Sequence, residues 1–420
     1  MLVEFKVRNF RSLRDEQTMT LVASPDKSLA QTHCISTGLK AVPQLLRSGI
    51  VYGANASGKS TVIFALATLR NLVLTSTSLP EAAFADQYTP FRLDRRTSAA
   101  PTEFALTILL DGIRYDYSFA YDAQRICSEQ LTVYRTNKGQ EWFERTWNSK
   151  SAEYDWAEFS THFKGQKDVW RRATRPQALF LTTAAQLNSE QLKPLFDWIS
   201  TGMVILSWSG LLNLSPTLQS MDQPGFKERV LELLRAADIH IADIGIDKQP
   251  GHQVEFKFEN GKAPEFVARE QEVSVVKFLH RVKGEDDVWF DGRFESAGTQ
   301  KLLAYMGPLL DALDNGKLLV IDELDSSLHP MLMRFVLELV HNPSISRRGA
   351  QLLITTHDTS LLDLELVRRD QIWFVEKDEH QASKLFPLSD FSPRKNEALE
   401  RGYLFGRYGA IPFVSRPNLH

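Results

Sequence analysis

A glycine-rich segment that ends in a lysine limits the possible folds of this chain more than any other feature. Residues 53–60 read Gly-Ala-Asn-Ala-Ser-Gly-Lys-Ser and fit the phosphate-binding pattern G-x-x-x-x-G-K-[ST] at every fixed position. The apolar run Ile50–Tyr52 precedes them, and the helix-compatible run Thr61–Leu69 follows. A strand, a phosphate-binding loop and a helix in this order predict the core of an α/β P-loop protein.

Each part of this loop suits a bound triphosphate. The glycines let the backbone wrap closely around a phosphate, and the start of the helix presents free N–H groups with a partial positive charge. We expect Lys59 to add a point charge for the β- and γ-phosphates and to take part in catalysis, and the Ser60 hydroxyl to ligate Mg²⁺. The predicted nucleotide-binding residues of the loop are Gly53, Asn55, Gly58, Lys59, Ser60 and Thr61.

A second apolar run far downstream ends in two carboxylates. Residues 317–323 read Lys-Leu-Leu-Val-Ile-Asp-Glu, which predicts a buried parallel strand that delivers acids to the edge of a sheet. Because the chain also contains a complete P-loop, Asp322 is predicted to hold Mg²⁺. Glu323 is predicted to polarise the attacking water as the general base.

Two further segments carry candidate site residues. Ser296-Ala297-Gly298 opens an apolar helix, and a helix start built from small residues can bind a second phosphate group. His357 follows the apolar strand 352–356, where a histidine can hydrogen-bond a γ-phosphate or the attacking water. Taken alone, the first segment could equally be an ordinary helix cap and His357 an ordinary residue at a strand end. The order of all four elements favours the functional interpretation.

That order resembles the ATP-binding-cassette (ABC) ATPases, and the details resemble their RecF-like and chromosome-maintenance branch. Residues 7–13, Val-Arg-Asn-Phe-Arg-Ser-Leu, are similar to the opening of that branch, and residues 324–330 are similar to its D-loop and "LHP" ending. The tail segments 369–377 and 402–412 resemble the narrower AAA15 group of stand-alone ATPases. The signature departs from the transporter type, Gln87 is the nearest candidate for a Q-loop, and no aromatic A-loop is evident.

The resemblance implies a fold and a composite site. It implies an α/β P-loop NTPase of the ABC-ATPase type, with an antiparallel β-subdomain and an inserted helical lobe. It also implies that two copies associate head-to-tail, as a dimer or a higher homo-oligomer such as a hexamer. Ser296 and Gly298 would then complete the ATP site of the other copy, with Asp325 of the D-loop near the boundary, and Arg11 is assigned to the nucleotide as well.

Patterning suggests three parts along the chain. Residues 1–150 should hold the P-loop and a β-subdomain, with a hairpin turn at Asp111-Gly112. Residues 151–290 are expected to form a mainly helical lobe, in which Pro and Gly at 249–251 predict a turn and Asn260-Gly261 a hairpin. Residues 291–420 should complete the ATPase head.

The resemblance also suggests a role. The AAA15 group includes ATPase subunits of two-component phage-defence systems such as PARIS, which implies an oligomeric sensor or scaffold. Its partners would be a separate Toprim-type effector nuclease and a phage-encoded trigger protein. The residues after His357 contain no Toprim-like acidic pattern, so no effector of that kind is expected in the chain itself. The alternative is a RecF-like or SMC-like DNA-repair ATPase, for which direct DNA binding would be required.

Composition narrows the class of protein. The 420 residues carry a net charge of −3, which argues weakly against a bulk electrostatic nucleic-acid binder. The two cysteines, Cys34 and Cys127, provide neither a disulfide framework nor metal-ligand spacing. The charged, alternating start is unlike a signal peptide, and no apolar run approaches the roughly 20 residues of a membrane span. A cytoplasmic ATPase is therefore expected.

Overall fold

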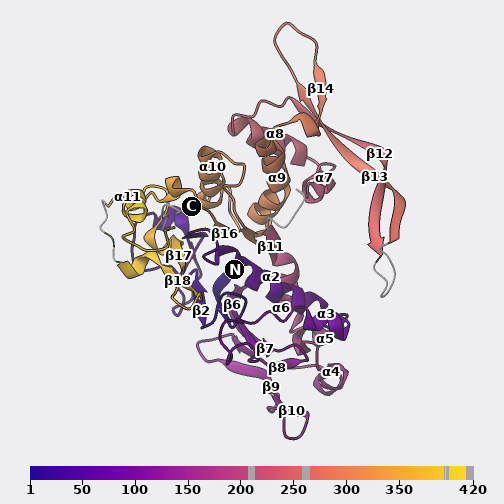
Figure 1. Cartoon of the computed structure of the whole chain (residues 1–420), viewed down its shortest axis with the longest axis vertical. Coiled ribbons are helices and arrows are strands. Elements are labelled where there is room, and N and C mark those ends of the chain that lie inside the picture. The colour runs from indigo at the N-terminus through magenta and orange to yellow at the C-terminus, as the bar shows by residue number, and fades with distance from the viewer. Residues whose placement is uncertain (207–212, 258–264, 392, 394–396, 413–420) are drawn as a thin grey trace, which may run out of the picture. The chain divides into compact units, whose positions relative to one another are not determined.

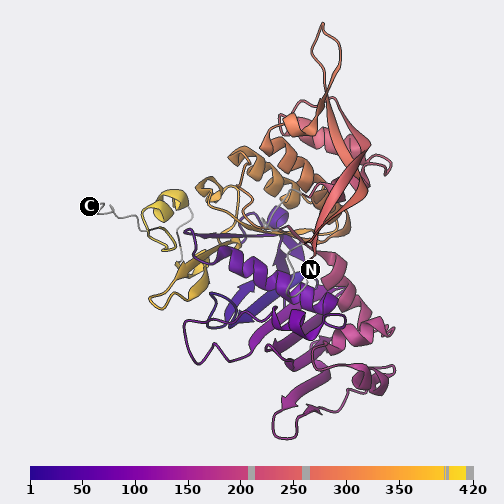
Figure 2. The same ribbon diagram turned by 45° about the vertical axis from the view of Figure 1, so that its right-hand side comes forward.

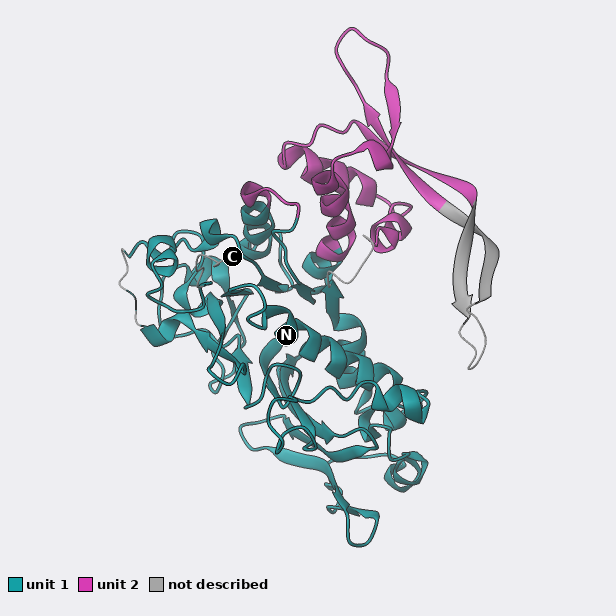
Figure 3. Ribbon diagram, viewed as in Figure 1, with its two compact units in different colours: residues 1–209, 311–326, 333–420 teal, residues 210–310, 327–332 magenta. Residues whose placement is uncertain are grey.

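The chain divides into two compact units. The computed structural model describes residues 1–206, 213–257, 265–391, 393 and 397–412, with side chains left undescribed at 251–257 and 265–273. Unit 1 comprises Met1–Ser209, Asp311–Ser326 and Met333–His420, and unit 2 comprises Gly210–Leu310 and Ser327–Leu332 (Figure 3).

A six-stranded sheet forms the centre of unit 1 (Figure 1). Its first five strands are parallel, and only the last pair is antiparallel. The parallel strands β15, β16 and β5 are buried along their whole length, which explains why the sequence reads there as unbroken apolar runs. In spatial order the strands are β11 (Met203–Leu206), β15 (Leu318–Ile321), β16 (Gln351–Thr355), β5 (Ser48–Gly53), β17 (Ile372–Lys377) and β18 (Ser383–Pro387).

The second sheet of unit 1 is antiparallel and has seven strands. The hairpin between β6 and β7 turns at Asp111 and Gly112, whose φ angles of 48° and 76° are the left-handed values that a two-residue hairpin turn requires. The predicted turn is therefore present. In spatial order the strands are β10 (Glu153–Trp156), β9 (Gln140–Asn148), β8 (Ile126–Tyr134), β7 (Ile113–Tyr121), β6 (Thr102–Leu110), β1 (Leu2–Arg8) and β2 (Gln17–Thr20).

Helix α2 (Lys59–Thr75) packs in the hydrophobic core that the two sheets share. Its buried side chains include Val62, Leu66 and Leu69, at the spacing of one helical face. The same core contains Val51 of the six-stranded sheet and Phe104 of the seven-stranded sheet. Because α2 is held by both sheets, its N-terminus is fixed at the end of β5.

A buried ion pair ties the seven-stranded sheet to helix α5 (Phe180–Gln186). The side chains of Arg145 and Glu129 are fully buried and lie 2.7 Å apart. Glu129 also accepts hydrogen bonds from the backbone N–H groups of Phe180 and Leu181 at the start of α5, at 2.7 and 2.9 Å. These added bonds compensate the desolvation of the carboxylate, and loss of either partner would leave a buried charge at a cost of about 3–5 kcal/mol.

The remaining elements of unit 1 are short. A two-stranded sheet and small helices surround the two larger sheets (Figure 1). They are β3 (Cys34–Ser36), β4 (Gln44–Leu46), α1 (Ala30–His33), α3 (Glu81–Ala85), α4 (Lys167–Ala173), α6 (Lys193–Asp197) and α11 (Leu399–Leu404).

Unit 2 combines helices with a three-stranded antiparallel sheet (Figure 2). The sheet contains β12 (Asp243–Lys257), β13 (Glu265–His280) and β14 (Val288–Asp291), and the helices are α7 (Ser215–Ser220), α8 (Phe226–Ala236) and the first part of α9 (Ala297–Asn315). Helix α10 (Pro330–His341) begins in unit 2 and continues in unit 1.

The middle of the chain differs from the sequence expectation in two respects. Residues 151–209 belong to unit 1, and the longest elements between 210 and 290 are the strands β12 and β13 rather than helices. The turn expected at 249–251 is wrong, because β12 runs through Pro250, which pairs with Glu272 of β13. A proline fits there because β12 is an edge strand, where its missing N–H breaks no inner ladder. The hairpin signal Asn260-Gly261 lies outside the described residues.

Helix α9 is anchored within unit 2 by a hydroxyl from α7. Pro308 lies inside the helix and interrupts its hydrogen-bond ladder, because it has no N–H to donate to the carbonyl of Ala304. The hydroxyl of Thr217 lies 2.9 and 3.2 Å from the carbonyl oxygens of Leu303 and Ala304 and accepts a hydrogen bond from the Gly307 N–H at 2.9 Å. The side chain of Thr217 thus satisfies the groups that the interruption exposes. Among the helices of the described residues, none is both long and apolar enough to cross a membrane.

Candidate functional site

The predicted phosphate-binding loop lines a cavity of about 530 Å³ in unit 1. The strands β15, β16, β5 and β17 are parallel, so their carboxyl ends meet at one edge of the sheet, where α/β proteins bind ligands. Residues that follow these strands therefore converge around the loop. The lining comprises residues 55–61 of the loop and helix start, with Arg11, Ser12, Glu323, His357 and Lys377.

Lys59 folds back onto its own loop. Its Nζ donates hydrogen bonds to the carbonyl oxygens of Gly53 and Ala54, at 2.9 and 3.0 Å. Burial lowers the pKa of Lys59 from 10.5 to about 8, and the nearby carboxylates Glu323, Asp325 and Asp322 offset part of that shift. The loop therefore holds the ammonium group close to the position that a phosphate would occupy.

Two glycines of the loop leave no room for a side chain. A Cβ on Gly53 would overlap the carbonyl oxygen of Val375, and one on Gly58 would overlap the hydroxyl of Ser383. Gly58 also has a φ of 112°, a left-handed conformation that glycine adopts without strain. Strands β17 and β18 thus press against the loop, and the glycines permit that contact.

A single hydroxyl connects the two predicted acids. Asp322 follows β15 directly, and Ile321 pairs with Ile354 of β16, which brings Asp322 beside Thr355. The Thr355 Oγ1 donates a hydrogen bond to Asp322 Oδ1 at 2.6 Å and accepts one from the Glu323 N–H at 2.7 Å. Ser60 Oγ lies 3.2 Å from the same Asp322 Oδ1. Glu323 has a φ of 51°, a costly value for glutamate that this network supports.

His357 and Asp325 meet at the same edge. The His357 N–H donates a hydrogen bond to Asp325 Oδ2 at 3.1 Å, while Asp325 Oδ1 is buried without a hydrogen-bond partner among the described residues. Desolvation and the charge of Lys59 lower the pKa of His357, against the opposing effect of Asp325 and Glu323. The imidazole is therefore neutral at pH 7 and can donate from one nitrogen and accept at the other.

The N-terminal segment 9–12 braces the loop. The Asn9 side chain donates to three carbonyls of the segment 97–101 and so fixes that segment beside β1. Ser12 Oγ donates to Thr61 Oγ1 at 3.2 Å, and the Ser383 Oγ lies 2.5 Å from the Ser57 carbonyl oxygen and 2.8 Å from Ser12 Oγ. Arg11 lines the cavity, with its guanidinium 4.5 Å from the ring centre of Phe64.

Sequence reasoning missed Thr355, Ser383 and Lys377. Thr355 and Lys377 end β16 and β17, and Ser383 begins β18, so each lies at the same end of the sheet as the loop. The only signal in the sequence for Thr355 was its position two residues before His357.

A second hollow of about 400 Å³ adjoins the cavity. It shares Arg11, Ser12 and Lys377 with the cavity and adds Gln381 and the segment 89–93. Gln87, the candidate for a Q-loop, lines neither space, and its side-chain oxygen accepts a hydrogen bond from Asn71 at 3.2 Å.

The predicted signature lies in unit 2, whereas the lining of the cavity belongs to unit 1. Ser296 Oγ accepts a hydrogen bond from the Thr299 N–H at 3.1 Å and so caps α9. Gly298 faces the carbonyl oxygen of Ser327, where a side chain would be crowded. Within its own chain, Ser296 therefore acts as the cap of α9.

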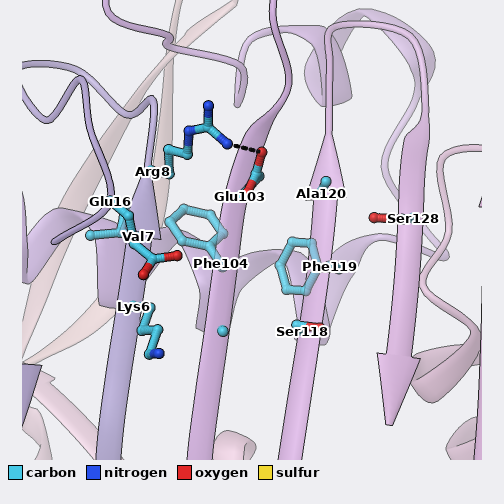
Figure 4. A pocket seen from close by; sticks show the side chains of 11 residues that line it. Lys6, Val7, Arg8, Glu16, Glu103, Phe104, Ser118, Phe119, Ala120 and Ser128 are labelled. Atoms are coloured by element: carbon cyan, nitrogen blue, oxygen red, sulfur yellow. Dashed lines mark hydrogen bonds and ion pairs between the residues drawn. The ribbon is translucent and has the colours of Figure 1, made fainter. Parts of the chain in front are cut away.

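Another hollow, of about 400 Å³, lies on the seven-stranded sheet (Figure 4). It is lined in part by small side chains such as Ala105, Ser118 and Ala120. Its charged residues are of both signs, and Arg8 and Glu103 form an exposed ion pair at 3.2 Å. It has no concentration of one charge and no residue of the P-loop, so the cavity at the loop remains the better ligand site.

The oxygen ligands at the loop fit Mg²⁺ delivered with a nucleotide. The Ser60 hydroxyl and the Asp322 carboxylate are adjacent, and Mg²⁺ is commonly held by one or two protein oxygens together with substrate phosphates. Among the described residues, no group of three or more His, Cys, Asp or Glu side chains could hold a metal without such help.

The family comparison covers most of the chain. The AAA_21 family, described as an AAA domain of the AbiEii toxin type from type IV toxin–antitoxin systems, matches residues 50–363. This match begins in β5 and extends past His357. A comparison with curated proteins gives no match.

If this site hydrolyses ATP, Thr355→Val should lower the rate at least tenfold, because valine can neither donate to Asp322 nor accept from the Glu323 N–H. Thr355→Ser keeps the hydroxyl and should restore the rate to within about threefold. Phosphate release at saturating MgATP measures the rate, and ATP affinity without Mg²⁺ serves as the control. Equal rates for the valine and serine variants would show that the hydroxyl has no such role.

Proposed function

Because this chain belongs to the AAA_21 family of AAA domains, we propose that it binds ATP at the P-loop cavity and hydrolyses it to ADP and phosphate. One arrangement supports this most strongly: Lys59, Glu323 and His357 line a single cavity, and Asp322 lies beside Ser60 of the same lining. These groups can bind the phosphates, hold the metal ion and position the water, which phosphoryl transfer from a nucleotide to water requires.

The loop would bind the triphosphate. The first residues of α2 line the cavity, where the N–H groups of a helix start can bind phosphate, and Lys59 would exchange its two loop carbonyls for phosphate oxygens. Ser60 and Asp322 would hold Mg²⁺, which neutralises charge on the β- and γ-phosphates when bound.

Glu323 would then act on the attacking water. Its carboxylate would accept a proton from that water as the oxygen attacks the γ-phosphorus and the bond to the β-phosphate oxygen breaks. His357, neutral and next to Asp325, would hydrogen-bond the γ-phosphate or the same water. Thr355 touches neither substrate nor water in this scheme and positions Glu323.

We further propose that the ATPase is of the ABC type and works as a head-to-tail pair or larger ring. The support is that Ser296 and Gly298 start a helix whose free N–H groups suit a phosphate but lie in unit 2, outside the lining of the cavity. In a pair, this helix start would close the ATP site of the other copy, with Asp325 at the boundary. ATP would then join the copies and hydrolysis would release them.

For the biological role we propose an AAA15-type, PARIS-like scaffold that controls a separate Toprim-type nuclease in response to a phage protein. The description of the matching family names a toxin of toxin–antitoxin systems, which are also two-component arrangements. The second candidate is a RecF-like DNA-repair ATPase. In its favour, α4 exposes Arg171 and Arg172, which suit DNA phosphates.

Native mass spectrometry of the tagged chain, co-expressed with its neighbouring genes and kept in MgATP, tests the role. The scaffold proposal predicts a homo-oligomer that carries a nuclease-sized protein. A bare dimer that retains DNA and stimulates hydrolysis with it would favour the repair ATPase instead.

We expect Glu323→Gln to bind MgATP with an affinity within about threefold of the wild type and to hydrolyse it at least a hundredfold more slowly. The same variant should accumulate as an ATP-bound oligomer, because release would follow hydrolysis. Phosphate release and sedimentation velocity measure the two effects. A normal hydrolysis rate would contradict the general-base assignment, and a variant that stays monomeric in ATP would contradict the pairing.

The pKa of about 8 for Lys59 predicts how ATP affinity depends on pH. Bound phosphates raise the pKa of the ammonium group, so ATP binding takes up a proton above pH 8. Affinity should be constant from pH 7 to 7.5 and should then fall, by up to about tenfold per pH unit, between pH 8 and 9.5. Calorimetry without Mg²⁺, in two buffers of different ionisation enthalpy, measures affinity and proton uptake. Lys59→Arg, which stays charged, is the control, and an equal decline in both proteins would exclude Lys59 as the cause.

A further inference from the structure

Unit 2 exposes an aromatic patch directly before helix α9. The patch consists of Trp289, Phe290 and Phe294, with exposed fractions of 46%, 43% and 78%. Trp289 and Phe290 are consecutive residues of β14, an edge strand of the three-stranded sheet, so their side chains project from opposite faces of that edge. Phe294 ends a short 3₁₀ turn two residues before Ser296. Three exposed aromatic side chains within six residues give this edge of unit 2 more exposed apolar surface than a single exposed residue would, which suits an interaction site.

The aromatic patch belongs to an acidic segment. Five carboxylates and one arginine fall between residues 285 and 295. Three of the carboxylates already have basic partners, and within the described part of the chain Glu285 and Asp286 form no ion pair. The charged residues of the segment are Glu285, Asp286, Asp287, Asp291, Arg293 and Glu295.

The hollow beside the P-loop cavity has the complementary character. Its wall contains Leu93, which is 70% exposed, next to Phe91 and Pro90. The basic residues of the hollow are Arg11, Arg92 and Lys377. The segment 89–93 that lines it continues into Asp94, Arg95 and Arg96, which add two basic residues and one acid. Among the described residues, Arg92 and Arg95 have no carboxylate at ion-pair distance. An apolar, basic hollow is thus available for an aromatic, acidic partner.

Chain geometry brings the two surfaces together. This step rests on the proposed function, in which Ser296 of one copy reaches the ATP site of another. Two residues of extended chain span at most about 7 Å, so Phe294 must then lie at the margin of that site. The hollow forms part of that margin, because it shares Arg11, Ser12 and Lys377 with the cavity.

We propose that the aromatic patch of one copy of this chain docks into the hollow at Leu93 of a second copy. The patch lies in unit 2 and the hollow in unit 1, so the contact joins unlike surfaces and each copy offers both (Figure 3). Two such contacts close a dimer, and a different rotation between copies closes a larger ring. The apolar and charged groups of the two surfaces complement each other, which makes a second copy the occupant of the hollow. The contact also sets the position at which Ser296 enters the ATP site of the other copy.

Cross-linking between two cysteine variants tests this contact. Leu93→Cys and Phe294→Cys, each in the Glu323→Gln background, are mixed in MgATP and treated with a short bismaleimide. We expect the mixture to give at least ten times more cross-linked dimer than either variant alone. Both positions are exposed, so the variants should fold, and the natural Cys34 is buried and Cys127 partly buried.

Phe405→Cys is the matched control, because Phe405 is an equally exposed phenylalanine, at 84%, in unit 1. If Leu93→Cys cross-links to Phe294→Cys no better than to Phe405→Cys, the docking proposal is overturned. ATP binding is measured on the same samples with a fluorescent analogue. Absence of ATP binding by the wild type would overturn the proposed function, while the cross-linking yield, read with and without nucleotide, still decides the docking.

Discussion

The hydroxyl of Thr355 is the interaction on which the geometry of the site depends most. It uses its one proton toward Asp322 and accepts the N–H of Glu323, so one side chain fixes two consecutive acids in different directions. Glu323 can hold its left-handed backbone conformation because this bond and the Leu324 N–H bond to the Thr355 carbonyl oxygen support it. The order of strands makes this possible: β16 lies between β15 and β5, so Thr355 reaches the acids on one side while its backbone borders the strand that leads to the P-loop.

Much of the fold core was predictable because its signals are local. The P-loop has a fixed spacing, the parallel strands read as unbroken apolar runs because both of their faces are buried, and Asp111-Gly112 carries its turn type in two residues. The long strand β12 was not predictable in the same way. Pro250 has the local signal of a turn, and only the edge position of β12, which depends on β13, permits it within a strand.

The supporting residues of the site escaped prediction for a related reason. Ser383 lies 326 positions from Ser57, whose carbonyl oxygen it contacts, and Thr355 lies 33 positions from Asp322. A short hydroxyl residue at a strand end has many structural roles, and nothing in its neighbours along the chain distinguishes this one. The acids and the loop lysine, by contrast, can be recognised in the sequence because they are charged residues next to apolar segments. The sequence therefore predicts the groups that would meet a substrate better than the groups that hold them.

The backbone crosses between the two units four times, at 209/210, 310/311, 326/327 and 332/333. Two of these crossings fall inside the helices α9 and α10, which resist bending, and a third directly follows Ser326, one residue beyond Asp325. Unit 2 is thus joined to unit 1 by helical segments as well as by other segments of chain, and not by a single linker. Ser327 of unit 2 is only two peptide bonds from Asp325, so a shift in the backbone position of Ser327 acts directly on the peptide that carries Glu323 and Asp325 beside the P-loop cavity.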